Sequence, residues 1–86
     1  MSASSRAPVA IVTGAARRIG ATIVEQLHHR GLNVVVHYRG SAEAADELIG
    51  RLNRERGGSV ISVQADLADA SAPKMILKAA LDAYGV

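Results

Sequence analysis

The chain has 86 residues, of which 49% are apolar and 21% are charged, with a net charge of +2 and no cysteine. This composition is too apolar for a disordered segment and fits one globular domain or part of one. The lack of cysteine excludes disulfides and thiolate metal sites, and two aromatic residues, Tyr38 and Tyr84, are too few for a stacking surface for nucleic acid.

The positive charge is concentrated in the N-terminal part of the chain. Residues 1–40 contain five arginines and a single acidic residue, Glu25. The same part carries a glycine-containing turn, so we expect a small anionic ligand and no nucleic acid. The N-terminal residues lack the apolar core of a signal peptide, and no apolar run approaches the ~18 residues of a membrane span. We therefore expect a cytosolic protein without membrane contact.

The apolar residues alternate between strand and helix periodicity along the chain. The pattern predicts short strands at 9–12, 34–36 and 59–63. After the first strand, Ile19, Ile23, Val24 and Leu27 recur at helical spacing up to Gly31, a residue type that favours a helix C-terminus.

Two further helices are predicted in the second half of the chain. Ser41 is the expected N-cap of a helix that ends before Gly57, and Ser71 or Asp69 is the expected cap of the last one. Each has an apolar face: in the second helix Ala45, Leu48, Ile49 and Leu52, and in the third Met75, Ile76, Ala79 and Ala80.

The resulting order, β-α-β-α-β-α, predicts an α/β fold with a parallel sheet that is covered on both faces. Right-handed crossovers place the strands in the order 3-2-1, which is the N-terminal half of a Rossmann-like doubly wound sheet. The last helix ends at 84–86, where a fourth strand would be expected to start. We therefore expect a flexible N-terminus at 1–7 and a partial domain at 8–86, truncated before that strand.

The turn after the first strand, Thr13-Gly14-Ala15-Ala16-Arg17-Arg18-Ile19-Gly20, is a candidate phosphate site. A glycine turn at a helix N-terminus lets an anion approach free N–H groups. The turn does not match G-x-G-x-x-G, but it resembles the T-G-x-x-x-G-I-G turn of short-chain dehydrogenases, with Arg18 in place of the middle glycine. The resemblance implies that Gly14 and Gly20 permit the tight turn and close packing, and that Arg17, Arg18 and Ile19 line the pyrophosphate and nicotinamide side. The alternative is a tight strand–helix turn without a ligand.

The end of the second strand indicates which dinucleotide would bind. An acidic residue about 20 positions beyond the glycines holds the ribose hydroxyls in NAD-binding proteins, whereas an arginine accommodates the 2′-phosphate of NADP. This segment has no carboxylate and contains His37, Arg39 and Ser41 instead, which favours NADPH. The alternative makes Arg39 a solvated loop residue and His37 a filler at the strand end.

The segment His37-Tyr38-Arg39-Gly40-Ser41-Ala42, together with the Arg18 substitution, is similar to the cofactor-phosphate segment of pteridine reductases. The resemblance implies NADPH-dependent reduction of biopterin or folate-type pterins. It implies that Arg18 contacts both cofactor phosphate and pterin, and that the segment from His37 through Tyr38 and Arg39 to Ser41 surrounds the 2′-phosphate. It also implies that Asp66 hydrogen-bonds the adenine amino group with Leu67 beside it, although Asp66 could instead cap the turn after the third strand.

The acid–base residues of short-chain reductases are absent from these 86 residues. Their Tyr-x-x-x-Lys pair has no counterpart, because Tyr38 is followed four positions later by Ala42 and Tyr84 lies near the last residue. We assign no catalytic or metal-binding residue, and His28-His29 is interpreted as a pair of surface histidines. The intact protein is expected to be a homotetramer. Two alternatives stay open: another short-chain reductase, such as one for 3-oxoacyl thioesters, and a non-catalytic nucleotide-binding fragment.

Overall fold

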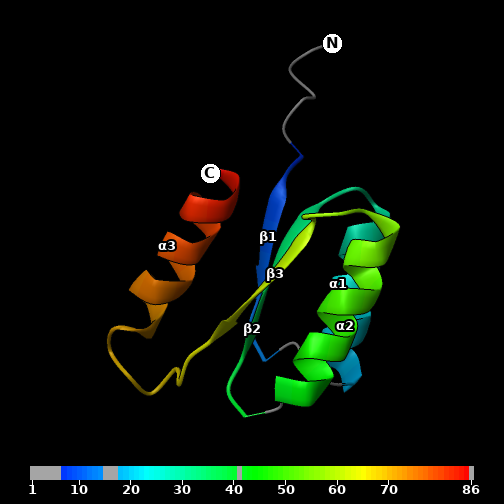
Figure 1. Cartoon of the computed structure of the whole chain (residues 1–86). Coiled ribbons are helices and arrows are strands. Elements are labelled where there is room, and N and C mark those ends of the chain that lie inside the picture. The colour runs from blue at the N-terminus through cyan, green and yellow to red at the C-terminus, as the bar shows by residue number, and fades with distance from the viewer. Residues whose placement is uncertain (1–6, 15–17, 41, 86) are drawn as a thin grey trace.

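The computed structural model describes residues 7–14, 18–40 and 42–85. Strands and helices alternate along these residues, as predicted (Figure 1). The elements are β1 (Val9–Val12), α1 (Arg18–His29), β2 (Asn33–Tyr38), α2 (Ala42–Glu55), β3 (Val60–Gln64) and α3 (Ala72–Tyr84). The expected flexible N-terminus covers residues 1–7, of which 1–6 lie outside the described residues, and the expected cap Ser41 lies outside them as well, so both stay predictions.

All strand pairs are parallel, and β2 lies between its two neighbours in the order β1-β2-β3. Val12 pairs with Val36 in one ladder, and Val36 pairs with Ser62 in the other. These are the neighbour relations expected of 3-2-1, read from the other edge of the sheet. Whether a further strand lies beside β1 stays a prediction.

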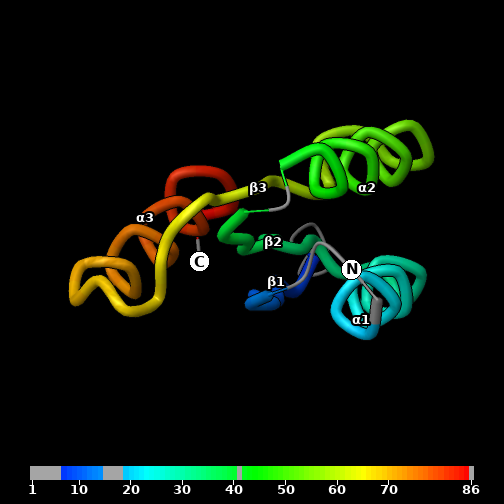
Figure 2. The backbone as a smooth tube through the Cα atoms, turned by 90° about the horizontal axis from the view of Figure 1, so that it is seen from below, coloured from blue at the N-terminus to red at the C-terminus, as the bar shows by residue number. Residues whose placement is uncertain are grey.

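The sheet is covered on both faces (Figure 2). Helices α1 and α2 lie on one side of the strands and α3 on the other. Because successive side chains of a strand point to opposite faces, Val34 and Val36 pack in a cluster with Val24, Leu48 and Leu52, all of them buried. Val35, on the other face, packs against α3.

The apolar pattern of α1 predicts its buried face only in part: Val24 is buried and Leu27 packs against the same core, but the two isoleucines do not. Ile19 is 78% exposed and Ile23 is 44% exposed, whereas Val24 and His28, four residues apart, are fully buried. The buried stripe is therefore centred on Val24 and His28, which makes the interpretation of His28 as a surface residue wrong; His29 is exposed as expected. Counting apolar residues found Val24 but missed His28, because a polar ring occupies this core position.

The ends of α1 and α3 confirm some of the predicted signals and not others. Gly31 follows α1 with a left-handed φ of 92°, a conformation that glycine adopts without steric strain. Ser71 precedes α3, but its hydroxyl makes no cap and donates to Asp69 Oδ1 instead. In the predicted face of α3, Ile76 and Ala80 are buried while Met75 is 48% exposed.

A buried polar cluster joins α1 to the loop between α2 and β3, at the amino end of the sheet. His28 Nε2 lies 2.7 Å from Ser59 Oγ, and this hydroxyl donates to the carbonyl of Arg56. Since the hydroxyl proton is used there, we assign the ring proton to Nε2. Nδ1 is then an unprotonated nitrogen, buried without a hydrogen-bond partner among the described residues.

The pKa of His28 is lowered, first by burial and then by the nearby positive charge of Arg56; His29 adds to the lowering and Glu55 opposes it. The ring is therefore protonated more readily in the unfolded chain than in the folded chain. Stability is complete above the ordinary histidine pKa of 6.5 and falls as the pH is lowered through it.

We expect His28→Gln, which can still donate to Ser59, to lose less stability on acidification than the wild type. The slopes of unfolding free energy against pH should differ by at most about 1.4 kcal/mol per pH unit, the value for one proton. Urea denaturation between about pH 7.5 and about pH 5.5 measures both slopes. Identical slopes would show that His28 does not titrate differently on folding.

Candidate cofactor site

A cavity of about 460 Å³ opens at the carboxyl end of the sheet. Because the three strands are parallel, the segments that follow them meet at this edge. The lining residues come from all three strand ends: Thr13, Gly14, His37, Arg39, Asp66, Leu67 and Ala68. Five of these seven are among the residues predicted for the cofactor, so the fold does bring that group together.

The glycine turn begins at the end of β1 and is held by a hydrogen bond to β2. Gly14 has a left-handed φ of 61°, which a side chain would strain. Its N–H donates to Nδ1 of His37 over 3.1 Å. A Cβ at this position would have no atom within 4 Å, so a side chain would not clash with its surroundings. The requirement for glycine therefore comes from the backbone conformation alone.

The His37 ring is 2% exposed and uses both of its nitrogens inside the protein. Nδ1 accepts the hydrogen bond from Gly14. Nε2 lies 2.8 Å from the carbonyl oxygen of Ala65. The resemblance places His37 among the residues that surround the 2′-phosphate, but with both ring nitrogens bonded to the backbone the ring offers no further polar group to a phosphate. The physical reason is the parallel register, which places His37 beside the ends of both neighbouring strands.

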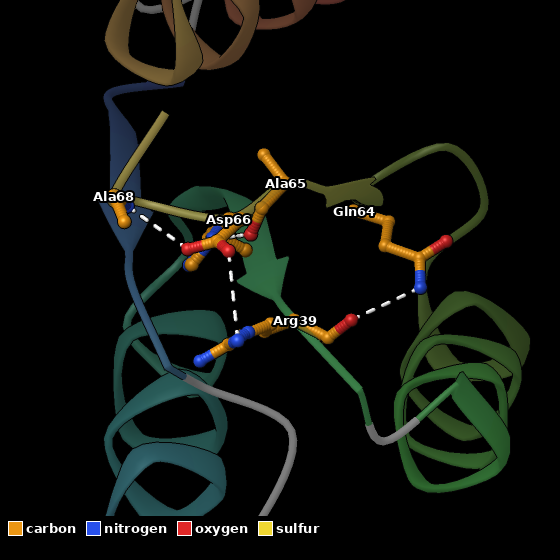
Figure 3. A network of polar contacts seen from close by, with 6 residues as sticks. Arg39, Gln64, Ala65, Asp66 and Ala68 are labelled. Atoms are coloured by element: carbon orange, nitrogen blue, oxygen red, sulfur yellow. Dashed lines mark hydrogen bonds and ion pairs between the residues drawn. The ribbon is translucent and has the colours of Figure 1, made fainter. Parts of the chain in front are cut away.

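Arg39 and Asp66 carry opposite charges and both line the cavity. Figure 3 shows the ion pair between them. Arg39 Nη2 lies 3.5 Å from Asp66 Oδ2, and the two side chains are 76% and 47% exposed. The Arg39 carbonyl accepts a hydrogen bond of 3.0 Å from the side chain of Gln64. An ion pair this exposed contributes little to stability and exchanges readily for another partner.

Asp66 also shapes the loop that follows β3. Its Oδ1 accepts from the N–H of Ala68 over 2.9 Å, so the capping role considered for this residue is present (Figure 3). Leu67, next in the chain, is 52% exposed. An exposed apolar side chain beside a carboxylate offers a stacking surface and a hydrogen-bond acceptor, which are the groups an adenine ring requires.

The remaining predicted residues lie around the start of α1 and the end of β2. Arg17 and Ser41 lie outside the described residues; Arg18 begins α1, but its side chain is not described. Ile19 is strongly exposed, and Gly20 is half-buried in the first turn of the helix. Tyr38 ends β2 and its carbonyl accepts from the N–H of Ala65.

Sequence reasoning missed several residues of this edge. Thr13 and Ala68 line the cavity, and Ala65 joins it to His37 through its backbone. Thr13 is the first residue of the turn identified from the sequence, so its place in that turn could have indicated that it lines the site. Ala65 and Ala68 act through main-chain groups, which side-chain chemistry does not reveal.

Two negative findings apply to the described residues. Within ranges 7–14, 18–40 and 42–85, no group of three or more histidines or carboxylates is arranged to hold a metal ion. In the same part of the chain, no helix is long and apolar enough to cross a membrane.

The parallel β-α-β-α-β-α order, the glycine turn and a cavity at the carboxyl edge define the class of nucleotide-binding α/β folds. Within this class, the model of the short chain dehydrogenase family matches residues 8–86, and the chain belongs to that family.

Individual relatives in this family are reductases. Pteridine reductase 1 of Leishmania tarentolae is 51% identical over 69 residues, 80% of this chain and 24% of the relative. Versicolorin reductase of Emericella nidulans is 42% identical over 90% of the chain and 29% of the relative. The 3-oxoacyl-acyl-carrier-protein reductase of Staphylococcus aureus Mu50 is 38% identical over 88% and 30%. The chain thus spans less than a third of the length of these curated relatives.

The geometry predicts that the charge of Asp66 matters little for stability, while its turn matters more. Asp66→Asn removes the ion pair but keeps the oxygen that accepts from Ala68, so the unfolding free energy should fall by less than about 1 kcal/mol. Asp66→Ala also loses the turn and should be less stable by a further ~1 kcal/mol. Urea denaturation of both variants would contradict this assignment if Asp66→Asn were the less stable one.

Proposed function

We propose that the protein is an NADPH-dependent reductase of a pterin substrate, and that the cavity holds the adenosine half of the cofactor. When bound, NADPH supplies a hydride to the substrate. The observation that carries the proposal is Arg39 on the cavity rim, next to the end of β2, where an NAD-binding protein would place a carboxylate. The described residues therefore fit an extra phosphate at this position.

The cofactor's groups are assigned to the two sides of the carboxyl edge. Arg39 and Ser41 bind the 2′-phosphate at the end of β2, with Tyr38 beside them. Asp66 and Leu67 bind the adenine. The pyrophosphate and nicotinamide side is formed by Gly14, Arg17, Arg18, Ile19 and Gly20, where the first turn of α1 offers N–H groups that no helical carbonyl accepts.

Binding would change the partner of Arg39. A phosphate dianion offers more charge and more acceptor oxygens than one carboxylate, so Arg39 leaves Asp66 and pairs with the cofactor. Oδ2 of Asp66 is then free to accept from the adenine amino group, while Oδ1 keeps its bond to Ala68. When Arg39 exchanges Asp66 for the phosphate, both the 2′-phosphate contact and the adenine contact can therefore form.

The pterin substrate is supported by the relative with 51% identity, whose name states that it reduces pteridines. We place the pterin next to Arg18 at the start of α1. A 3-oxoacyl thioester is the second candidate, supported by the relatives with 38% identity. Calorimetric titration with dihydrobiopterin and with acetoacetyl-coenzyme A, each in the presence of the oxidised cofactor, separates the two. Binding of the thioester alone would replace the pterin in the proposal.

We expect Arg39→Ala to weaken NADPH binding by about 10- to 100-fold, which corresponds to losing a charged hydrogen bond of about 1.5–3 kcal/mol. NADH binding should hardly change, because NADH lacks the 2′-phosphate. The matched control is Arg30→Ala, which removes another exposed arginine from the opposite edge of the sheet. Fluorescence titrations at low and high salt measure each dissociation constant, and the NADPH effect should shrink at high salt. Equal losses for both cofactors would remove Arg39 from the 2′-phosphate site.

The 86 residues themselves should bind NADPH without turning over a pterin. The reason is that the Tyr-x-x-x-Lys pair, which supplies the proton in the family, does not occur in this sequence. The measurement is the NADPH absorbance in the presence of dihydrobiopterin, compared with a reaction without protein. Turnover above that background would show that other residues of the chain can supply the proton.

A further inference from the structure

His37 connects segments from all three strands at the carboxyl edge. The residue lies near the end of the central strand β2 and is almost completely buried. Its ring accepts from the N–H of Gly14, which follows β1, and contacts the carbonyl of Ala65, which follows β3. These contacts join residues that are 23 and 28 positions away in the sequence.

The two partners determine where the ring carries its proton. A backbone N–H can only donate, so Nδ1 must present a lone pair to Gly14. A carbonyl oxygen can only accept, so Nε2 must carry the hydrogen that is donated to Ala65. The tautomer assigned from these partners is neutral and protonated at Nε2, and both ring nitrogens are fully used.

The described start of the glycine turn, at Gly14, is hydrogen-bonded to this ring. A Cβ built on Gly14 would contact nothing within 4 Å, so the space beside this residue is open. The bond from Gly14 to His37 joins the start of the turn to the central strand, 23 positions away in the sequence. Ala65 directly precedes Asp66, so the second bond anchors the opposite wall of the cavity.

We propose that His37 is a positioning residue that sets the separation between the glycine turn and the Asp66 loop, and thereby the space for the dinucleotide. The inference rests on the proposed function for its ligand. It differs from direct 2′-phosphate binding in one measurable respect. A residue that acts through the backbone affects NADPH and NADH equally, whereas a phosphate ligand affects NADPH alone.

Three variants separate the two hydrogen bonds of the ring. His37→Asn can keep an acceptor near the place of Nδ1 for Gly14. His37→Gln can keep a donor near the place of Nε2 for Ala65. His37→Leu fills a similar volume with neither group, and circular dichroism shows which variants are folded.

The cofactor titrations have a clear expected result. His37→Leu should bind both NADPH and NADH about 3- to 10-fold more weakly, as expected for losing hydrogen bonds between uncharged groups, and their affinity ratio should stay at the wild-type value. His37→Asn and His37→Gln should each recover part of the loss. Unchanged affinities in folded variants, or a loss confined to NADPH, would overturn the inference.

A direct measurement tests the bonds without any cofactor. In ¹⁵N-labelled wild-type protein, a scalar coupling between the Gly14 amide nitrogen and His37 Nδ1 should be detectable across the N–H···N bond. The ¹⁵N shifts should place the proton on Nε2. A ring protonated at Nδ1 would overturn the inference, whereas wild-type protein that shows the coupling but binds neither cofactor would instead refute the proposed function.

Discussion

The parallel pairing of β2 with strands on both sides is the constraint on which the rest of the structure depends. Val34, Val35 and Val36 are completely buried because helices cover both faces and neighbours cover both edges of this strand. Parallel pairing also fixes direction, so all three strands deliver their following loops to one edge. The cavity therefore contains residues from positions as distant as Thr13 and Ala68. A change that shifted β2 by one residue would invert both cores and separate the site.

A buried histidine lies at each end of the sheet, but the two rings differ in how many of their nitrogens have hydrogen-bond partners. At the amino end, His28 has a hydroxyl partner for Nε2 and no described partner for Nδ1. At the carboxyl end, both nitrogens of His37 have backbone partners. An unsatisfied buried nitrogen costs about 1–3 kcal/mol, so the amino end tolerates an imperfection that the carboxyl end avoids. This contrast agrees with a ring at the cavity that must hold a defined position.

The sequence predicts the order of elements because this follows from local signals. The β-branched runs place β1 correctly, and the positions of Gly14 and Arg39 at the ends of strands follow from their spacing, whereas Asp66 was singled out by the family resemblance. One position of the buried face of α1 could not be predicted in this way. It is filled by His28, whose ring contacts Ser59, 31 residues away. The two backbone contacts of His37 were missed for the same reason, since only the folded register brings these atoms close to the ring.

The ion pair between Arg39 and Asp66 explains how the residue proposed for the 2′-phosphate and the residue proposed for the adenine can lie side by side. A lone arginine on the rim would attract any anion, and a lone carboxylate would repel the phosphates of the cofactor. At 3.5 Å the two charges largely cancel at a distance, while exposure keeps their interaction weak. Under the proposed function, a ligand has to offer Arg39 a better anion and Asp66 a donor at the same time, and an adenosine 2′-phosphate carries both groups on one molecule. In that proposed site NADH would offer the adenine amino group but no anion for Arg39, so it would gain only half of the exchange, and selectivity for NADPH would be a property of the pair.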